Sequence, residues 1–409
     1  MLAACGDDSR PTDASTDAPD VSTDTMTDVA VDVQNDTSED TGADVVMDTA
    51  MDTSDGGVCT RGDLSEDKVR FVVVSLPFET PDDSYAVHRL ALDGTLSPTG
   101  NTFRMARAFD TDIAFSLDGA IGMLAQDDGT LGIFQLAADG SPSVIESGRT
   151  STAYASRVYA DPNDMNTFWY LSSQTRSNGG GVYRVTIDCD GSVLNDELVF
   201  EANLPYGMGF TGDGQGIVMA KALQGTVGDV FRVDLTTETL IGSAGELFPA
   251  DDWIGAGFAL GGDHVFGGDN SGFSSDPNSI AAAPLEAMAF GDAQRITEVE
   301  DPTRMLLSPF EDKLIVISGF ANAFYEFDYD AAEAFPLSGG EELAYVTGRP
   351  ALPGSAALIS RGSLRGLAVI SENVHLRSIR FEEGNVTDLG RYDLGSADET
   401  IPGALGVQP

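Results

Sequence analysis

From Leu64 onward, the chain consists of short apolar runs separated by turns of Gly, Asp and Asn. The clearest stretch, residues 112–140, has the sequence DIAFSLDGAIGMLAQDDGTLGIFQLAADG. It predicts three strands, with a tight turn at Asp118-Gly119 and a loop at residues 127–129 between them, and a further turn at Asp139-Gly140. This pattern predicts an all-β fold for the greater part of the chain.

Units of the same kind recur along the sequence. Residues 207–235 and 304–330 are clear copies, and weaker copies lie at residues 65–94, 157–191, 255–272 and 355–384. The first turns of the units fall near positions 66, 118, 163, 213, 262, 311 and 364, a spacing of about 50 residues. Four short strands in a repeat of this length are typical of a β-propeller blade. The spacing therefore predicts a seven-bladed β-propeller, with six or eight blades as alternatives.

The stretches before these turns are rich in small residues, as in GMGF, GAGF, GSAAL and GALGV. The innermost strands of a propeller crowd around its axis, where small side chains permit close approach of neighbouring backbones. The chain ends IPGALGVQP, which resembles such an inner strand, whereas the first unit begins at its turn and lacks one. We therefore expect the C-terminal strand to complete the first blade and close the ring.

The repeat unit resembles that of the YVTN/lactonase-like seven-bladed propellers. In that family a Ser-Pro-Asp-Gly turn leads into a Tyr-Val-Thr-Asn strand and then into a strand that ends in aspartate. Here the turn reads SLDG, TGDG or SPFED, and the following strands read GMLAQDDGTLGIFQL or KLIVISGFANAFYEFD. The resemblance covers residues 64–409. It implies the propeller fold and, as one functional alternative, a lactonase-like activity.

The beginning of the chain has a different composition. Residues 6–57 contain 15 Asp and Glu, a single basic residue, Arg10, and no aromatic residue. A segment this acidic and this poor in large apolar side chains cannot offset the entropy lost on ordering. We therefore expect a disordered tether over residues 6–57, followed by one propeller domain over residues 58–409.

The four residues Leu2-Ala3-Ala4-Cys5 resemble a bacterial lipobox, although no basic region and no apolar region of a signal peptide precede them. We predict that residues 1–5 are the remnant of a lipoprotein signal and that Cys5 is the lipidation site. The protein would then be anchored to a membrane of the cell envelope through its lipid, facing the periplasm or the cell exterior.

Three cysteines are present, Cys5, Cys59 and Cys189, without a CxxC motif or a Cys/His cluster that would indicate zinc. If Cys5 is lipidated, Cys59 and Cys189 are left to pair. A disulfide between them would fasten the entry segment to the body of the domain and would require an oxidising compartment. Two unrelated free thiols are the alternative until the separation of the two residues is known.

The charge of the chain narrows the choice of partners. There are 22 Lys and Arg against 66 Asp and Glu, a formal net charge of -44. This field repels phosphate backbones and so excludes nucleic acid as a direct partner, whereas cations would be attracted. We expect a monomer whose partner is a protein, a glycan or a small ligand.

Ligands of propellers usually bind at the axis, on the face formed by the loops that enter the inner strands. The candidate ligand-binding residues in these loops are Arg107, Asp110, Asp112, Arg157, Tyr206, Asp252, Trp253, Asp301, Arg304 and Arg349. Carboxylates from several blades could hold calcium or another divalent cation, and the arginines could bind an anionic sugar or lactone. The alternative is that they are ordinary solvated loop residues.

No catalytic constellation is visible in the sequence. None of the three histidines, His88, His264 and His375, lies beside an obvious Ser or Cys nucleophile, and no G-x-S-x-G, H-E-x-x-H or P-loop motif occurs. His88 and His375 fall within predicted third strands, which favours a structural role. We therefore predict a binding or scaffolding lipoprotein, with a lactonase-like or other metal-assisted hydrolase at the axis as the alternative.

Overall fold

The computed structural model describes Cys59, Arg61, Leu64 and residues 68–77, 84–108, 110–244, 254–269, 279–286, 289–290, 294–296, 299, 302–318, 323–343, 355–372, 374–395 and 402–409. The chain divides into two units, Met1–Gly57 and Val58–Pro409. The predicted lipobox with Cys5 and the predicted tether over residues 6–57 lie outside the described residues. Among the residues that are described, no helix has the length and apolar character needed to cross a membrane.

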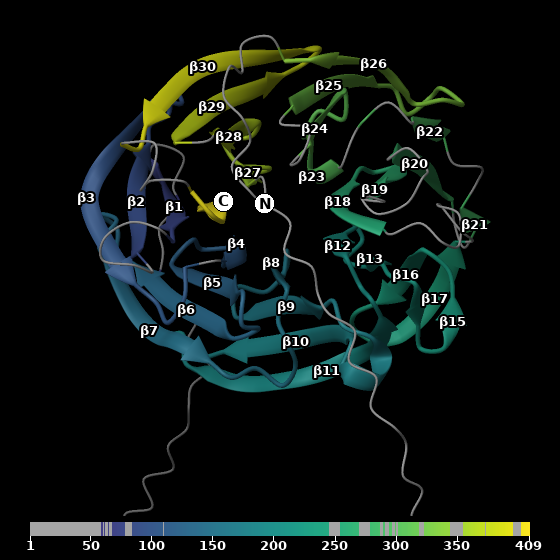
Figure 1. Cartoon of the computed structure of the whole chain (residues 1–409), viewed down its shortest axis with the longest axis horizontal. Helices are drawn as coiled ribbons and strands as arrows, with labels where there is room; N and C mark the ends of the chain where they lie inside the picture. The colour runs from purple at the N-terminus through teal and green to yellow at the C-terminus, as the bar shows by residue number, and fades with distance from the viewer. Residues whose placement is uncertain are drawn as a thin grey trace, which may run out of the picture. The chain divides into compact units, whose positions relative to one another are not determined.

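The described part of Val58–Pro409 is a seven-bladed β-propeller, as the repeat spacing predicts (Figure 1). From the innermost strand outward, blade 1 consists of β31 (Leu405–Val407), β1 (Arg70–Leu76), β2 (Ser84–Leu90) and β3 (Leu96–Arg104). Blade 2 consists of β4 (Asp110–Phe115), β5 (Ile121–Gln126), β6 (Leu131–Leu136) and β7 (Pro142–Arg149). Blade 3 begins with β8 (Arg157–Ala160), β9 (Thr167–Ser172), β10 (Gly181–Ile187) and β11 (Val193–Asn203). A short 3-10 helix, η1 (Arg176–Asn178), precedes β10.

Blades 4 to 7 follow the same antiparallel order. Blade 4 consists of β12 (Gly207–Phe210), β13 (Gly216–Met219), β16 (Val230–Asp234) and β17 (Thr239–Ala244). Blade 5 consists of β18 (Ile254–Leu260), β19 (His264–Asp269) and β20 (Ser279–Glu286), and both β21 (Ala289–Phe290) and β22 (Gln294–Ile296) pair with β20. Blade 6 consists of β23 (Pro302–Leu307), β24 (Lys313–Ser318), β25 (Ala323–Tyr329) and β26 (Leu337–Glu342), and blade 7 consists of β27 (Ala356–Leu358), β28 (Leu367–Glu372), β29 (His375–Glu382) and β30 (Asn385–Asp393).

The second strand of each blade explains how the ring is held together. In β1 the side chains of Val72 and Val74 pack against blade 7, whereas Val73 packs against blade 2. The same alternation divides the second strands of the other blades, and the described residues form seven apolar cores, one at each interface between neighbouring blades. Because both faces are covered, β1, β5, β9, β13 and β28 are continuously buried runs.

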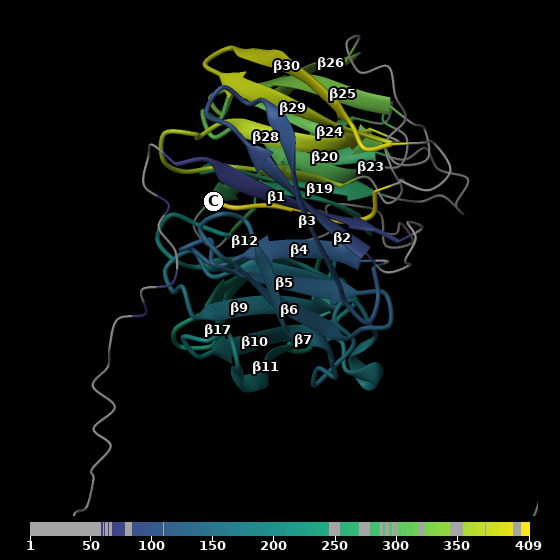
Figure 2. The ribbon, with the colours of Figure 1, turned by 90° about the vertical axis from the view of Figure 1, so that its left-hand side faces the viewer.

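The C-terminal strand β31 is the innermost strand of blade 1, where Gly406 lies opposite Val73 of β1. Figure 2 shows blade 1 between blades 2 and 7, with β1 between β4 and β28. Side chains of the C-terminal segment enter both flanking cores, Ala404 on the blade 2 side and Leu405 on the blade 7 side. The two ends of the propeller are therefore joined by a sheet and by two apolar cores.

Small residues on the inner strands allow the close approach that the sequence predicts. A Cβ atom on Gly207 would lie 2.6 Å from the Cβ atom of Phe258 on the next inner strand. A Cβ atom on Gly209 would lie 2.8 Å from the aromatic ring of Phe258. A Cβ atom on Gly406 would lie 2.5 Å from the side chain of Ile113. Larger residues at these positions would push neighbouring blades apart at the axis.

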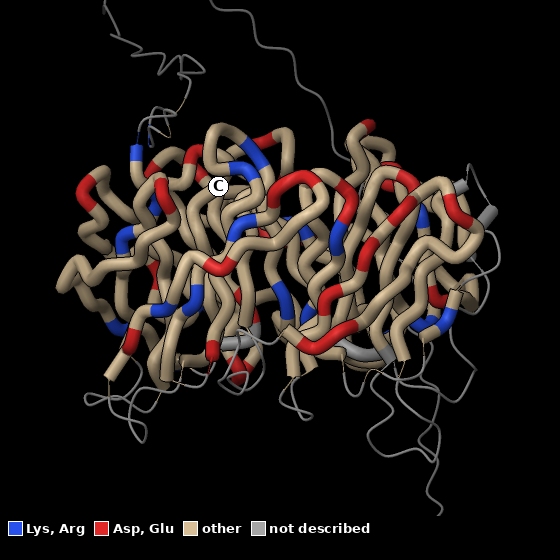
Figure 3. Tube along the Cα trace, turned by 90° about the horizontal axis from the view of Figure 1, so that it is seen from above, with Lys and Arg blue, Asp and Glu red and all other residues tan. Residues whose placement is uncertain are grey.

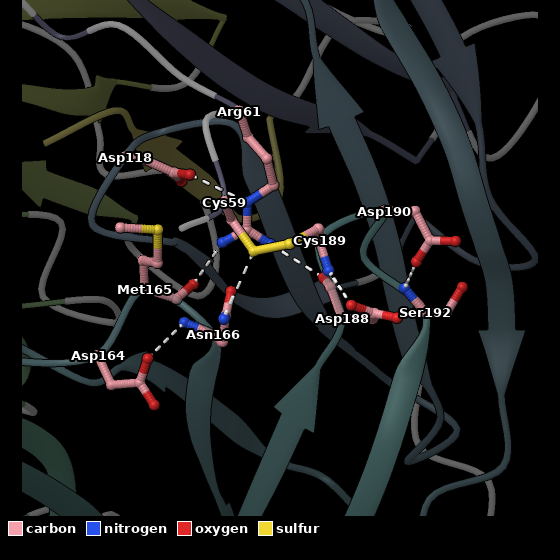
Figure 4. Close-up of a disulfide and its surroundings, with 10 residues drawn as sticks. All are labelled: Cys59, Arg61, Asp118, Asp164, Met165, Asn166, Asp188, Cys189, Asp190 and Ser192. Carbon is pink, nitrogen blue, oxygen red and sulfur yellow. Dashed lines mark hydrogen bonds and ion pairs between the residues drawn. A yellow bond between two sulfur atoms is a disulfide. The ribbon is translucent and has the colours of Figure 1, made fainter. Parts of the chain in front are cut away.

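A clip fastens the entry segment to blades 2 and 3 (Figure 4). Cys59 and Cys189 form a disulfide with 5.4 Å between their Cα atoms, which supplies the separation that the sequence could not give. Cys189 lies in the turn between β10 and β11. The Arg61 guanidinium donates to the Asp118 carboxylate of blade 2 at 3.0 Å and to the carbonyl oxygen of Met165 in blade 3 at 2.8 Å.

One segment departs from the predicted repeat. The repeat predicts three strands of one blade over residues 207–235. The structure has an additional hairpin, formed by β14 (Ala222–Leu223) and β15 (Thr226–Val227), between the second and third strands of blade 4. β14 pairs with β11, so this hairpin extends blade 3 instead of blade 4. Its two-residue strands are too short to produce a recognisable alternation in the sequence.

On the side of the propeller seen in Figure 3, Lys and Arg positions lie among Asp and Glu positions. His88 is a buried titratable residue on β2, the third strand of blade 1, and its burial affects stability. Its side chain is buried, its ring stacks edgewise on Tyr392 at 5.0 Å, and neither ring nitrogen has a hydrogen-bond partner among the described residues. Burial lowers the pKa of His88 to about 4.

We predict an acid-dependent loss of stability from His88. Between pH 6.5 and pH 4 the unfolded chain binds a proton at this position and the folded chain does not, so stability falls as the pH is lowered. The full effect is about 3 kcal/mol. The free energy of unfolding measured in urea should fall less steeply between pH 6.5 and pH 4 for His88→Phe than for the wild type. Equal slopes for wild type and His88→Phe would contradict the prediction.

Candidate functional site

Two of the predicted axial residues meet across the centre of the propeller. Asp112 lies on β4 of blade 2 and Arg304 on β23 of blade 6, and both strands are innermost in their sheets (Figure 1). The Arg304 Nη2 atom lies 2.8 Å from the Asp112 Oδ1 atom, although the residues are 192 positions apart in the sequence. Their side chains are 15% and 10% exposed, so this ion pair is largely shielded from solvent.

Arg157 at the start of β8 joins this pair. Burial lowers the pKa of Arg157, and the charge of Arg304 lowers it further, whereas Tyr159 and Asp112 act in the opposite direction. We call Asp112, Arg157, Tyr159 and Arg304 the axial cluster.

Tyr159 was not among the residues predicted from the sequence. Its hydroxyl oxygen accepts a hydrogen bond from the backbone N–H of Met208 on β12 at 3.3 Å, which ties blade 3 to blade 4. Burial raises the pKa of this hydroxyl, which therefore stays protonated and available as a donor. The alternation of a strand would have placed Tyr159 on the same face as Arg157.

The axial cluster carries an excess of positive charge. Burial disfavours the charged form of Arg304, but the Asp112 carboxylate outweighs it, so the pKa of Arg304 is raised. A single carboxylate therefore faces two guanidinium groups, which remain protonated in proteins. None of the described residues forms an ion pair with Arg157.

Other predicted site residues lie elsewhere. Arg107 lies beside the loop between β5 and β6, with its side chain half exposed and its Nε atom 3.9 Å from the Asp127 carboxylate and 3.8 Å from that of Asp128. Tyr206 precedes β12, and burial together with the charge of Asp229 raises the pKa of its hydroxyl to about 12.

Five of the predicted residues fall wholly or partly outside the described part of the chain. Asp110 is described as part of β4 but its side chain is not. The candidates that lie outside the described residues are Asp252, Trp253, Asp301 and Arg349. Within the described part of the chain, no group of three or more His, Cys, Asp and Glu side chains is arranged to hold a metal ion. Calcium or another divalent cation at the axis stays a prediction of the sequence.

We expect Asp112 and Arg304 to be strongly coupled. Asp112→Leu removes the carboxylate that pairs with the shielded Arg304 guanidinium and should lower the free energy of unfolding by about 3 kcal/mol. The double variant Asp112→Leu/Arg304→Met removes both charges of the pair and should recover most of this loss. Urea unfolding of the single and double variants measures the coupling. Additive losses in the double variant would show that the two residues do not interact.

Comparison with known proteins identifies the fold. No protein-family model and no curated protein matches the chain. Among solved structures, a putative 6-phosphogluconolactonase from Bacteroides uniformis ATCC 8492 is similar, with a TM-score of 0.61 and 11% identity over 83% of this chain and 99% of that one. A putative 6-phosphogluconolactonase from Bacteroides fragilis NCTC 9343 has a TM-score of 0.57 and 12% identity over 84% and 99%. The periplasmic gluconolactonase PpgL of Pseudomonas aeruginosa has a TM-score of 0.54 and 15% identity over 84% and 99%.

Proposed function

We propose that the propeller binds a small anionic ligand, bearing a carboxylate or a phosphate group, at the axial cluster. The observation that supports this proposal is that Arg157 lies near the shielded ion pair of Arg304 and Asp112, where the described residues provide two guanidinium groups and one carboxylate. A ligand anion would balance the charge of Arg157, and the planar guanidinium group suits bidentate binding of carboxylate or phosphate. The Tyr159 hydroxyl would donate to the same ligand or orient Arg157.

Hydrolysis of a sugar lactone is the second candidate, because the similar folds include proteins described as gluconolactonases. In such a reaction water adds to the ring carbonyl, the ring C–O bond breaks, and a hydroxy acid forms. Arg157 would stabilise the developing oxyanion, and Asp112 would accept a proton from the attacking water. The product is itself a sugar acid, which belongs to the anion class that the axial cluster is proposed to bind.

Gluconate and 6-phosphogluconate should raise the melting temperature of the protein, whereas neutral glucose should not, because charge on the ligand is the basis of recognition. Arg157→Gln should abolish the shift. Arg107→Gln is the matched control. It removes a half-exposed arginine beside Asp127 and Asp128 and should leave the shift in melting temperature unchanged. If neither anion binds, or if both variants lose binding equally, the axial assignment is wrong. Hydrolysis of δ-gluconolactone above the spontaneous rate, lost in Arg157→Gln, distinguishes an enzyme from a binding protein.

We also propose that the protein is a cell-envelope lipoprotein. The sequence Leu2-Ala3-Ala4-Cys5 and the acidic segment that follows it support anchoring through Cys5. The disulfide between Cys59 and Cys189 supports an oxidising compartment, because such bonds are rare where thiols are kept reduced.

In cells that express the chain from its own gene, we expect the protein in the membrane fraction with Cys59 and Cys189 oxidised. Cys5→Ser should release it, because the lipid would be the attachment. Fractionation followed by thiol labelling measures both properties. A wild-type protein that is found free of membranes, or whose Cys59 and Cys189 are labelled as thiols, would rule out this location.

A further inference from the structure

A cavity of about 370 Å³ lies at the opposite end of the inner strands from the axial cluster. It forms where β12, β18, β23 and β27, the inner strands of blades 4 to 7, end and enter the first turns of their blades. Its volume falls within the range of small-molecule sites, roughly 300–1,000 Å³. The larger apolar side chains of its lining include Phe210, Phe258, Leu260, Leu306, Leu307 and Leu358.

The polar side chains of the lining are Ser308, Glu311 and Ser360. The Ser308 hydroxyl donates to the Asp312 carboxylate at 2.6 Å, so its hydrogen bond is used within the turn. Among the described residues that line the cavity, Glu311 alone carries a charge. The cavity therefore combines an apolar wall with one carboxylate.

Glu311 occupies a position at which the corresponding turns of blades 2 and 4 have glycine. Gly119 and Gly214 have φ of 67° and 81°, and Glu311 adopts the same left-handed conformation with φ of 57°. This conformation is unfavourable for a residue with a Cβ atom, and such strain is often found at binding sites. Glycine would form the same turn without strain, so the turn itself does not require the carboxylate.

The Glu311 carboxylate is held in place without a counter-ion. Its Oε1 atom accepts a hydrogen bond from the backbone N–H of Gly262 at 2.8 Å, and none of the residues that the structure describes forms an ion pair with it. The charge of Glu311 acts on His264, but burial outweighs this effect and lowers the pKa of the imidazole, which is therefore neutral at pH 7. The Arg365 guanidinium stacks on the Phe310 ring instead, 4.8 Å from its centroid.

We propose that this cavity is a second ligand site, which binds a small organic ammonium ion with its charge at Glu311 and its apolar body against Phe258 and Leu358. The apolar lining favours a body of aliphatic or aromatic carbon, and the carboxylate favours a charged donor. The formal net charge of -44 also attracts a cation. This inference goes beyond the proposed function, because it concerns another site and a ligand of opposite charge.

Isothermal titration calorimetry of the full chain with 2-phenylethylamine and 2-phenylethanol tests this proposal. The two probes share an aromatic body and differ in charge. The amine should bind about tenfold or more tightly than the alcohol, because its ammonium group adds a charge-assisted hydrogen bond to Glu311. Equal affinities, or an amine that does not bind, would overturn the proposal.

Two substitutions remove the carboxylate in different ways. Glu311→Gln keeps the size of the side chain, and Glu311→Gly suits the left-handed turn, so at least the second variant should fold. Both should lower the affinity for the amine about tenfold, to that of the alcohol. Glu333→Gln is the matched control, because it removes an exposed carboxylate between β25 and β26 of the same blade and should leave both affinities unchanged. Equal losses in Glu311→Gln and Glu333→Gln would show attraction by net charge alone and would overturn the proposal.

Two further variants locate the bound amine. Leu358→Ala should weaken the amine and the alcohol by the same factor, because both use the apolar wall, and unchanged amine binding would contradict the assignment to the cavity. Arg157→Gln should leave amine binding unchanged, and gluconate binding should persist in Glu311→Gln. Failure of the amine to bind therefore leaves the proposed function standing, and failure of gluconate to bind leaves this inference standing.

Discussion

The second strand of each blade carries apolar side chains on both faces, and the structure depends on covering both. Val72 and Val73 are adjacent in β1, yet they pack in two different cores, one against blade 7 and one against blade 2. No blade can bury both faces by itself, so every blade requires two neighbours. A linear row of blades would leave one such face exposed at each end, and closure of the ring removes both of these exposed faces.

Closure of the ring also creates the site. The inner strands must converge on the axis, and small residues such as Gly207 and Gly209 allow them to do so. Side chains near the start of these strands then meet from distant parts of the chain, as Arg304 meets Asp112. The same geometry places the ends of β12, β18, β23 and β27 around a shared cavity.

Much of the fold was predictable because it repeats. The turn sequences SLDG and TGDG recur at a regular spacing, and their glycines, Gly119 and Gly214, adopt the left-handed conformation with φ of 67° and 81°. The SPFED turn was harder to recognise because Glu311 takes this conformation, with φ of 57°, in place of glycine. The hairpin of β14 and β15 could not be foreseen, since its pairing with blade 3 depends on tertiary contacts.

The site was predictable in part. Position within an entry loop or inner strand selected Asp112 and Arg304, which the structure brings together, but the same criterion selected Arg107, whose side chain lies beside Asp127 and Asp128. Sequence spacing gives the blade to which a residue belongs and does not give the direction of a long side chain. The ion pair between blades 2 and 6 therefore required the structure.

The central claim is that the axial cluster holds an anion, and a crystal structure of the full chain with gluconate tests it most directly. The account predicts the gluconate carboxylate within about 3 Å of a guanidinium nitrogen of Arg157, the distance of a charge-assisted hydrogen bond. Gluconate bound away from the axis, with no contact to Arg157, would contradict it.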